Sequence, residues 1–195
     1  MNTKFAQIAR SLNLSPRQEE IIIGSLLGDG HLAQTTRGYA FRVNHGIAQK
    51  EYVDWKYQEL IQFVNSMPDT HNENSYYFRT VSHPFFEQLR NEFYVGPKKI
   101  IPEKLIEWLT PLALSVWIMD DGTREGNQLR INSQSFTYDE NQKLARILEA
   151  KFGIESTINR DKHLFRLRIR EKSMALTKKL TVPYIIPNML YKFSL

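Results

Sequence analysis

Two aspartates stand at equivalent ends of two apolar segments. The segment IIGSLLGDG covers residues 22–30 and ends in Asp29 and a glycine, and LSVWIMDDG covers residues 114–122 and ends in Asp121 and a glycine. A carboxylate at the C-terminal end of a helix is disfavoured by the helix dipole unless a cation compensates its charge. The repeated placement therefore indicates a site for a hard divalent cation such as Mg²⁺, which prefers oxygen ligands.

Two glycines of the first segment indicate how the aspartates can meet. Gly24 and Gly28 lie four residues apart and share one face of a helix. If the two helices pack along this face, Asp29 and Asp121 lie side by side, where bound metal ions would suit phosphodiester hydrolysis. The glycine after each aspartate is expected to adopt the left-handed conformation that ends many helices. The alternative is a buried helix pair whose ends are bound by water.

An internal repeat surrounds the aspartates and predicts the elements that position them. Period-two alternation predicts strands over residues 39–45, 75–80, 128–134, 155–160 and 163–170. Helical periodicity predicts helices over residues 49–64, 84–93, 138–152 and 172–180. We therefore expect an α/β (α+β) fold of two pseudo-symmetric αββαββα halves, residues 1–100 and 101–195, with the two motif helices packed at the centre.

The composition of the 195-residue chain excludes several kinds of site. With no cysteine, the chain has no disulfide, thiolate metal site or cysteine nucleophile, so a metal must bind oxygen or imidazole. The net charge of +5 is compatible with nucleic acid binding. No apolar run reaches the roughly 20 residues that cross a membrane, and no secretory pattern is found at the N-terminus. We expect a soluble, intracellular protein with no membrane partner.

Polar and apolar side chains alternate along the predicted strands. In HLFRLRIR, residues 163–170, arginines occupy every second position and share one face of the sheet. Arg, Asn and Gln can make paired hydrogen bonds with guanine and adenine edges. An ordinary exposed sheet is the alternative, but it would favour Thr, Lys and Glu, and no acidic residue occurs among the outward positions identified. The expected DNA contacts are Arg42, Asn44, Arg79, Gln128, Arg130, Asn132, Gln134, Arg166, Arg168 and Arg170.

The chain resembles the LAGLIDADG homing endonucleases, in the single-chain form that carries both motifs. The resemblance runs from about residue 15 to residue 193. It is closest to the intron-encoded branch in PLALSVWIMDDGT (111–123), NSQSFT (132–137) and IIPNMLYKF (185–193). It implies saddle-shaped antiparallel sheets on double-stranded DNA and a staggered double-strand break at a long asymmetric site. It also implies a monomer that uses Mg²⁺, with Mn²⁺ as a substitute.

The resemblance assigns metal binding residue by residue. The acidic residue before the final glycine of each motif is Asp29 in the first and Asp121 in the second. The backbone carbonyls of Gly28 and Asp120 are expected to contact the metal ions as well. The second motif departs from the first, because Val116 and Asp120 stand where the first motif has two glycines. This bulk bears on how closely the two helices can approach.

Two lysines complete the catalytic residues that the resemblance implies. Lys99 stands two positions before the IP of KKIIPEKL, and Lys192 follows a tyrosine near the C-terminus. Each is expected to polarise the attacking water or to stabilise the charged transition state, with a solvated surface charge as the alternative. Two other functions stay open: an RNA-splicing maturase acting on its own intron RNA, and a non-cleaving DNA-binding regulator. The presence of Asp29 and Asp121 together with both lysines favours cutting.

Overall fold

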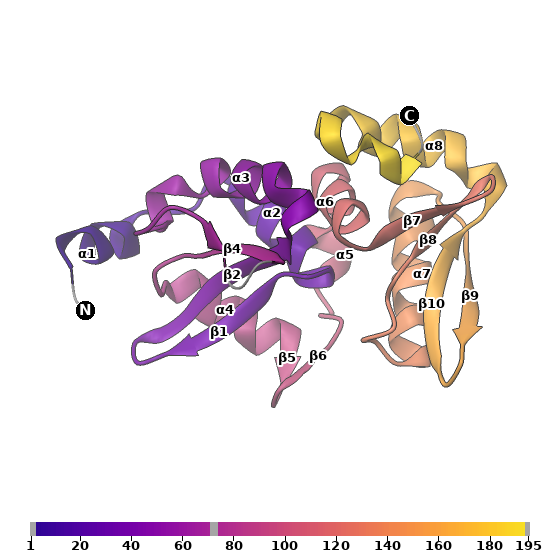
Figure 1. The fold of residues 1–195 in the computed structure, drawn as a ribbon. Helices are drawn as coiled ribbons and strands as arrows, with labels where there is room; N and C mark the ends of the chain where they lie inside the picture. The colour runs from indigo at the N-terminus through magenta and orange to yellow at the C-terminus, as the bar shows by residue number, and fades with distance from the viewer. Residues whose placement is uncertain (1–2, 71–73, 194–195) are drawn as a thin grey trace.

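Two helices that lead into the aspartates form the centre of the molecule, in a computed structural model that describes residues 3–70 and 74–193 (Figure 1). α2 (Pro16–Leu27) and α6 (Pro111–Asp121) each begin with proline, behind the N-cap residues Ser15 and Thr110. Proline suits this position because the N–H that it lacks would have no helical partner there. Residues 112–120 of α6 are all buried, as expected for a helix that is apolar nearly all round. None of the described helices is long and apolar enough to cross a membrane.

The first half is built on one antiparallel sheet. After α1 (Lys4–Ser11) and α2 it contains β1 (His31–Thr35), β2 (Gly38–Gly46), α3 (Lys50–Glu59), β3 (Asp69–Thr70), β4 (Ser75–Arg79) and α4 (Pro84–Phe93). The strand order is β1-β2-β4-β3. α3 and α4 pack on this sheet. The helix predicted over 49–64 ends at Glu59, because Leu60 and Phe63 both turn into the core and the chain continues as a short 3-10 helix, Ile61–Phe63.

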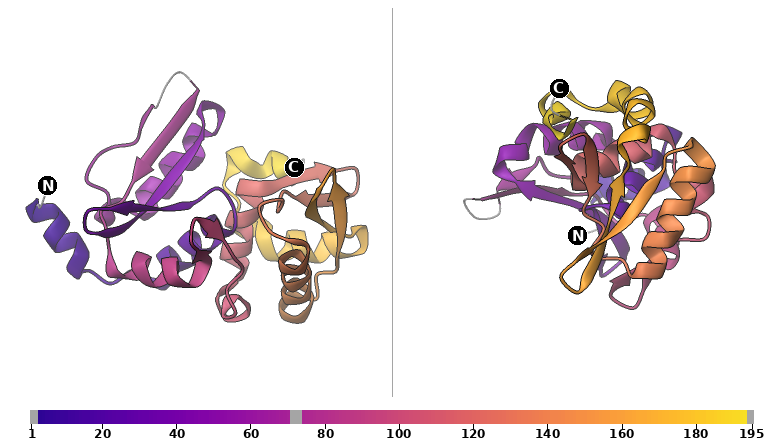
Figure 2. Two further views of the ribbon diagram at one scale, coloured as in Figure 1. Left: turned by 90° about the horizontal axis from the view of Figure 1, so that it is seen from below. Right: turned by 90° about the vertical axis from the view of Figure 1, so that its right-hand side faces the viewer.

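The second half repeats this plan. It contains α6, β7 (Gly122–Glu125), β8 (Gln128–Ile131), α7 (Tyr138–Phe152), β9 (Ser156–Asp161), β10 (Leu164–Ile169) and α8 (Glu171–Thr181). The strand order β7-β8-β10-β9 matches that of the first sheet, and the two sheets lie on either side of the α2–α6 pair (Figure 2). The prediction of two pseudo-symmetric αββαββα halves is confirmed. The boundary between residues 100 and 101 stays a prediction.

Short elements link the halves and follow the second one. β5 (Tyr94–Val95), β6 (Lys98–Lys99) and α5 (Leu105–Trp108) connect α4 to α6. The 3-10 helices Val182–Tyr184 and Pro187–Phe193 follow α8 and bring the chain back against α6. These connections matter for the site because they carry the two predicted catalytic lysines.

Two predicted strands of the second half end earlier than expected. β8 ends at Ile131, because Ser133 bonds back to the Ile131 carbonyl oxygen at 2.9 Å and the chain turns away from the sheet. β10 ends at Ile169, and Arg170 is the N-cap residue of α8. The alternating row of side chains is therefore shorter than the sequence predicts.

Candidate active site and nucleic-acid interface

The glycine face of α2 packs directly against α6. A Cβ atom on Gly24 would lie 2.3 Å from the carbonyl oxygen of Ala113 and 2.8 Å from Cβ of Val116. A Cβ atom on Gly28 would lie 2.5 Å from Cβ of Asp120. These distances are too short for any side chain, so both positions require glycine. Each glycine faces the bulkier residue at the equivalent place of the other motif, which explains how the helices stay close despite that bulk.

The glycine after each aspartate has a different role from the predicted one. Neither Gly30 nor Gly122 has a positive φ. A Cβ atom on Gly30 would lie 2.7 Å from the carbonyl oxygen of Ser25, and one on Gly122 would lie 2.4 Å from that of Ile118. The prediction of left-handed caps is wrong, because these glycines allow the turn to approach the backbone of the preceding helix.

Asp29 and Asp121 form one electrostatic cluster at the tips of the helix pair. Burial, followed by the charges of Asp29 and Asp120, raises the pKa of Asp121 to about 8. Burial and then Asp120 raise the pKa of Asp29, although 51% of its side chain is exposed. The indole Nε1 of Trp117 donates a hydrogen bond to Asp121 Oδ2 at 3.3 Å. A cation placed here would relieve the repulsion between the carboxylates.

Asp120, next to Asp121, takes part in a buried ion pair. Its Oδ1 accepts hydrogen bonds from Lys56 Nζ at 2.8 Å and from the Tyr52 hydroxyl at 2.7 Å. Its Oδ2 accepts from the backbone N–H of Asp29 at 3.2 Å. Burial, the largest single influence, would raise the pKa of Asp120, but Lys56, His45 and Tyr52 together outweigh it and the pKa is lowered. Asp120 therefore stays ionised and ties α6 to α3 and to the turn that carries Asp29.

His45 completes the buried side of the site. Its Nδ1 lies 3.0 Å from Gln49 Oε1 and 3.6 Å from Asp29 Oδ2. Its Nε2 lies 3.8 Å from Asp120 Oδ1 and has no hydrogen-bond partner within residues 3–70 and 74–193. Burial, followed by Lys56, lowers the pKa of His45 to about 4. The ring is therefore neutral at pH 7.

Sequence reasoning did not identify Lys56, Tyr52 or His45 as part of the site. One signal was available for the lysine. Tyr52, Lys56 and Leu60 recur at the spacing of one helix face, and all three are fully buried. A lysine in an apolar stripe indicates an anionic partner, because a buried charge without one is very costly.

Lys99 and Lys192 occupy equivalent places in the two halves. Lys99 Nζ donates to the carbonyl oxygen of Gly28 at 2.6 Å, and Lys192 Nζ donates to that of Asp120 at 3.3 Å. Each carbonyl belongs to the residue before a motif aspartate. Burial lowers the pKa of Lys99, and Lys192 is only 8% exposed. Neither lysine is a solvated surface charge.

The oxygen atoms around the helix tips suit a hard cation. They are the carboxylates of Asp29 and Asp121 and the carbonyl oxygens of Gly28 and Asp120. In the described part of the chain, no group of three or more His, Cys, Asp or Glu side chains could hold a metal ion. A metal site made of only two carboxylates and backbone carbonyl oxygens is compatible with that absence, because it contains fewer than three such side chains. The raised pKa of Asp121 is the observation that fits a bound cation, and metal binding by these residues stays a prediction.

The outward face of the first sheet carries the predicted polar residues. Arg42 pairs in register with Arg79, and Asn44 pairs with Tyr77. The guanidinium carbon of Arg42 lies 5.2 Å from the centre of the Tyr77 ring. The neighbouring Phe41 is fully buried on the opposite face. The alternation is as predicted, and contact with DNA stays a prediction.

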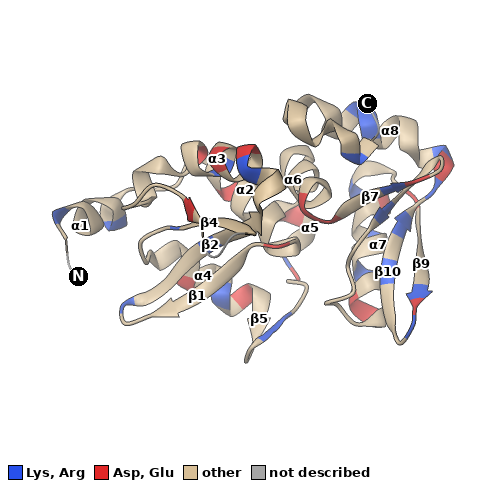
Figure 3. Cartoon of the chain, viewed as in Figure 1, with Lys and Arg blue, Asp and Glu red and all other residues tan. Residues whose placement is uncertain are grey.

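The strands of the second sheet carry acidic residues as well as arginines (Figure 3). Arg130 of β8 pairs in register with Arg168 of β10. Glu125 forms ion pairs with both, and Asp161 Oδ2 lies 3.5 Å from Arg166 Nη1. No acidic residue occurs among the outward positions identified from the sequence, but the face as a whole also carries Glu125 and Asp161. Both carboxylates stand at hairpin ends, just beyond the positions that the alternation identified.

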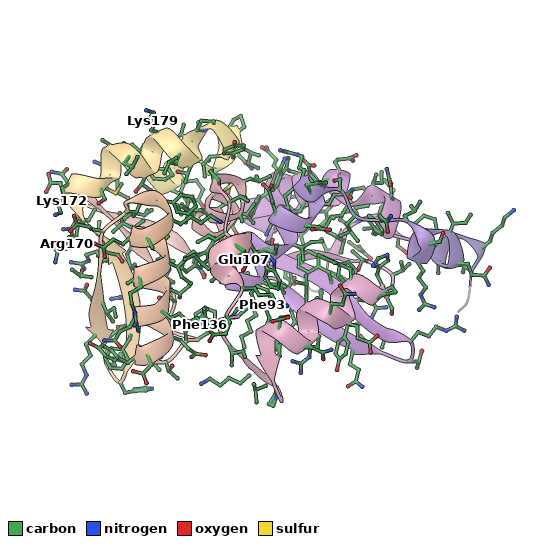
Figure 4. All side chains as sticks on the ribbon, turned by 180° about the vertical axis from the view of Figure 1, so that it is seen from behind. Phe93, Glu107, Phe136, Arg170, Lys172 and Lys179 are labelled. Atoms are coloured by element: carbon green, nitrogen blue, oxygen red, sulfur yellow. The ribbon has the colours of Figure 1, made fainter. Side chains whose placement is uncertain are left out.

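Three predicted DNA contacts lie past the strand ends. Asn132 follows β8, and the Nε2 of Gln134 donates to Asp161 Oδ2 at 3.0 Å. Arg170 Nη1 lies 3.8 Å from Glu155 Oε2 at the outer end of the second half (Figure 4). Arg170 therefore does not continue the row formed by the two arginines of β10.

The site and the fold define a class of protein. Residues 19–176 match the model of the LAGLIDADG DNA endonuclease family, a span that contains most of α2, all of α6, both sheets and both aspartates. The chain belongs to this family, and the predicted resemblance is confirmed.

Individual relatives cover the same region. The homing endonuclease I-WcaI, solved bound to its DNA recognition sequence, is 27% identical with a TM-score of 0.90, over 98% of this chain and 92% of that one. Probable intron-encoded endonuclease 1 of Wickerhamomyces canadensis is 29% identical over 92% of this chain and 84% of its own length. Cytochrome b mRNA maturase bI2 of Saccharomyces cerevisiae is 33% identical over 89% of this chain. The chain spans only 46% of that maturase.

Proposed function

We propose that the protein is a site-specific endonuclease that hydrolyses double-stranded DNA with the help of divalent metal ions. The observation that carries the proposal is the Asp29 and Asp121 pair at the tips of α2 and α6, with Lys99 and Lys192 in equivalent places beside it. Membership of the LAGLIDADG DNA endonuclease family and the similarity to DNA-bound I-WcaI support it.

The proposed metal site uses the carboxylates of Asp29 and Asp121, with the carbonyl oxygens of Gly28 and Asp120 nearby. A bound Mg²⁺ or Mn²⁺ supplies positive charge and Lewis acidity at the scissile phosphate. The buried carboxylate of Asp120 is not itself a ligand in this proposal. Its two oxygens are engaged by Lys56, Tyr52 and the backbone of Asp29, so it fixes the turn that presents the first metal ligand.

The two lysines supply the remaining chemistry from the protein. Lys99 and Lys192 place ammonium groups beside the two carboxylates, where they can hold a water or steady the charge of the phosphate. Burial lowers the pKa of Lys99, which makes its ammonium a readier proton donor. Trp117 holds the Asp121 carboxylate through its indole N–H.

The two sheets supply the proposed DNA contacts. Each sheet has one buried face and one outward face that carries arginines. These are Arg42 and Arg79 on the first sheet and Arg130, Arg166 and Arg168 on the second. Because one chain contains both motifs and both sheets, we propose that a monomer binds the duplex. The two sheets differ in sequence, which would give an asymmetric recognition site.

RNA splicing is the second candidate function, and the maturase relative favours it. The two functions separate experimentally, because a maturase would bind the RNA of its host intron whether or not it cuts DNA. Cleavage depends on Asp29 and Asp121 in our proposal, whereas RNA binding does not.

The deciding experiment selects cleaved molecules from a plasmid library with a randomised target segment. We expect one preferred site to be cut in Mg²⁺ and left intact in EDTA. Asp29→Asn and Asp121→Asn should bind that site in Ca²⁺ without cutting it. Asp139→Asn, at an exposed aspartate in the first turn of α7, should cut normally. Selective binding by the wild type without cutting would instead support the non-cleaving regulator.

A further inference from the structure

One carboxylate on the second sheet holds two arginines at once. Glu125, the last residue of β7, lies opposite Gln128 at the hairpin end. Its Oε1 pairs with Arg130 Nη1, and its Oε2 lies 2.6 Å from Arg168 Nη2. Since the two arginines are also neighbours in register across β8 and β10, the three side chains form a fork on the outward face.

The fork is partly shielded from water. The side chains of Glu125, Arg130 and Arg168 are 28%, 22% and 32% exposed. Ion pairs in this environment are screened less than pairs at a fully exposed surface. The Nε atoms of both arginines are buried and have no hydrogen-bond partner among the described residues, so each guanidinium is not fully engaged by the protein.

The first sheet has no equivalent arrangement in the part of the chain that the structure describes. Arg42 lies over the ring of Tyr77 there, and neither it nor Arg79 forms an ion pair with a described residue. A carboxylate on a face that binds DNA repels phosphate and lowers affinity for every sequence. The role of Glu125 on this face must therefore be something other than raising the affinity for DNA. Arginines held in one geometry lose less side-chain freedom on binding and can discriminate among base edges.

We propose that Glu125 is a specificity-determining residue of the DNA-binding face. It holds Arg130 and Arg168 for contact with base edges and keeps them from the phosphates. The inference rests on the proposed DNA-binding function. Glu125 follows Asp121 by four residues, and Arg130 lies in register with Thr123, between the two. The bases that Glu125 influences should therefore lie within a few base pairs of the cleavage position.

The test compares Glu125→Gln with the wild type in binding experiments with Ca²⁺, on a library of single-base variants of the selected site. We expect Glu125→Gln to bind unrelated DNA about 3- to 10-fold more tightly, with a salt slope steeper by about one. Discrimination should fall at one or two adjacent base pairs in the second half-site and stay unchanged elsewhere. Thermal melting checks that the variant folds.

Two further variants separate geometry from charge. Glu125→Asp keeps the charge but is too short to bridge both arginines, so it should also lose discrimination at the same base pairs. Glu155→Gln is the control, because it removes a carboxylate that pairs with Arg170 and Lys172 beside α8, outside the strands. It should leave discrimination unchanged at the base pairs that Glu125→Gln affects. Identical single-base profiles for the wild type and Glu125→Gln would overturn the inference, as would a uniform change at all positions. A wild type that binds selectively and never cuts would contradict the proposed endonuclease alone.

Discussion

Neutralising Asp121 should stabilise the metal-free protein. Asp121→Asn keeps the shape of the side chain and an acceptor for the Trp117 indole, and removes one charge from the helix tips. The ordinary pKa of 3.8 rises to about 8 in the folded chain, chiefly through burial and the neighbouring Asp29. At about 1.4 kcal/mol per pKa unit, the upper bound on the destabilisation is about 6 kcal/mol. Water around the half-exposed Asp29 screens the repulsion, so we expect a gain of about 1–3 kcal/mol at pH 8.

The pH dependence of this gain has a definite sign. Between about pH 4 and pH 8, the folded state binds more protons at Asp121 than the unfolded state does. The free energy of unfolding of the wild type therefore falls as pH rises through this window. The advantage of Asp121→Asn should be absent near pH 4, grow towards pH 8 and then level off. For a chain of this size, the gain corresponds to a rise in Tm of roughly 3–10 °C.

The assay is thermal melting in EDTA from pH 5 to pH 9, followed by the same series in Mg²⁺. Asp120→Asn is the matched control, because it changes the adjacent residue in the same way. It leaves Lys56 buried without its partner and should lower stability by about 3–5 kcal/mol. Mg²⁺ should raise the Tm of the wild type and narrow its gap to Asp121→Asn. A destabilised Asp121→Asn in EDTA, or a gap that does not change with pH, would refute this account of the site.

Three other predictions concern catalysis, packing and base recognition. Lys99→Met and Lys192→Met should each slow cleavage by roughly 10². The salt dependence of DNA binding should change by about one unit of slope at most. If cleavage falls only in proportion to binding, the two lysines are phosphate contacts and have no catalytic role. Gly28→Ala should lower stability by about 1–3 kcal/mol in chemical unfolding, because its Cβ would lie 2.5 Å from Cβ of Asp120, whereas Gly46→Ala, with its nearest atom 3.9 Å away, should be tolerated. Arg168→Ala should relax the choice of base at one or two positions in single-base profiling, and a uniform loss of affinity would assign it to the DNA backbone.

The helices predicted most accurately are those whose ends are defined by capping residues, glycine or proline in the local sequence. The helix over 138–152 is confirmed to the residue, because the capping box of Thr137 and Glu140 defines its start and Gly153 in a left-handed conformation ends it. The helix over 84–93 is confirmed in the same way and begins at a proline. The end of α3 was not predicted, since it depends on Leu60 turning into a core that the local sequence does not reveal.

In the candidate site too, the residues that were predicted are those that a local sequence pattern identifies. Asp29 and Asp121 were predicted because a repeated segment identified them, and the α2–α6 contact was predicted from glycine spacing. The buried pair of Lys56 and Asp120 joins residues from different halves of the chain, and no local pattern relates them. Glu125 was overlooked for a similar reason, because its arginine partners lie on other strands and its own position is a hairpin end.

The contact between α2 and α6 also bears on how the two halves evolved. If the internal repeat arose by duplication, the ancestral unit would have paired with a copy of itself. The second half can no longer pair with a copy of itself in this way. Two α6 helices packed together would place Val116 against Val116 and two buried Asp120 carboxylates next to each other. Two copies of α2 would leave glycine facing glycine and a gap between the helices. Each half therefore needs a partner of the other kind, and a single substitution towards symmetry in either helix would create a clash or a gap between α2 and α6.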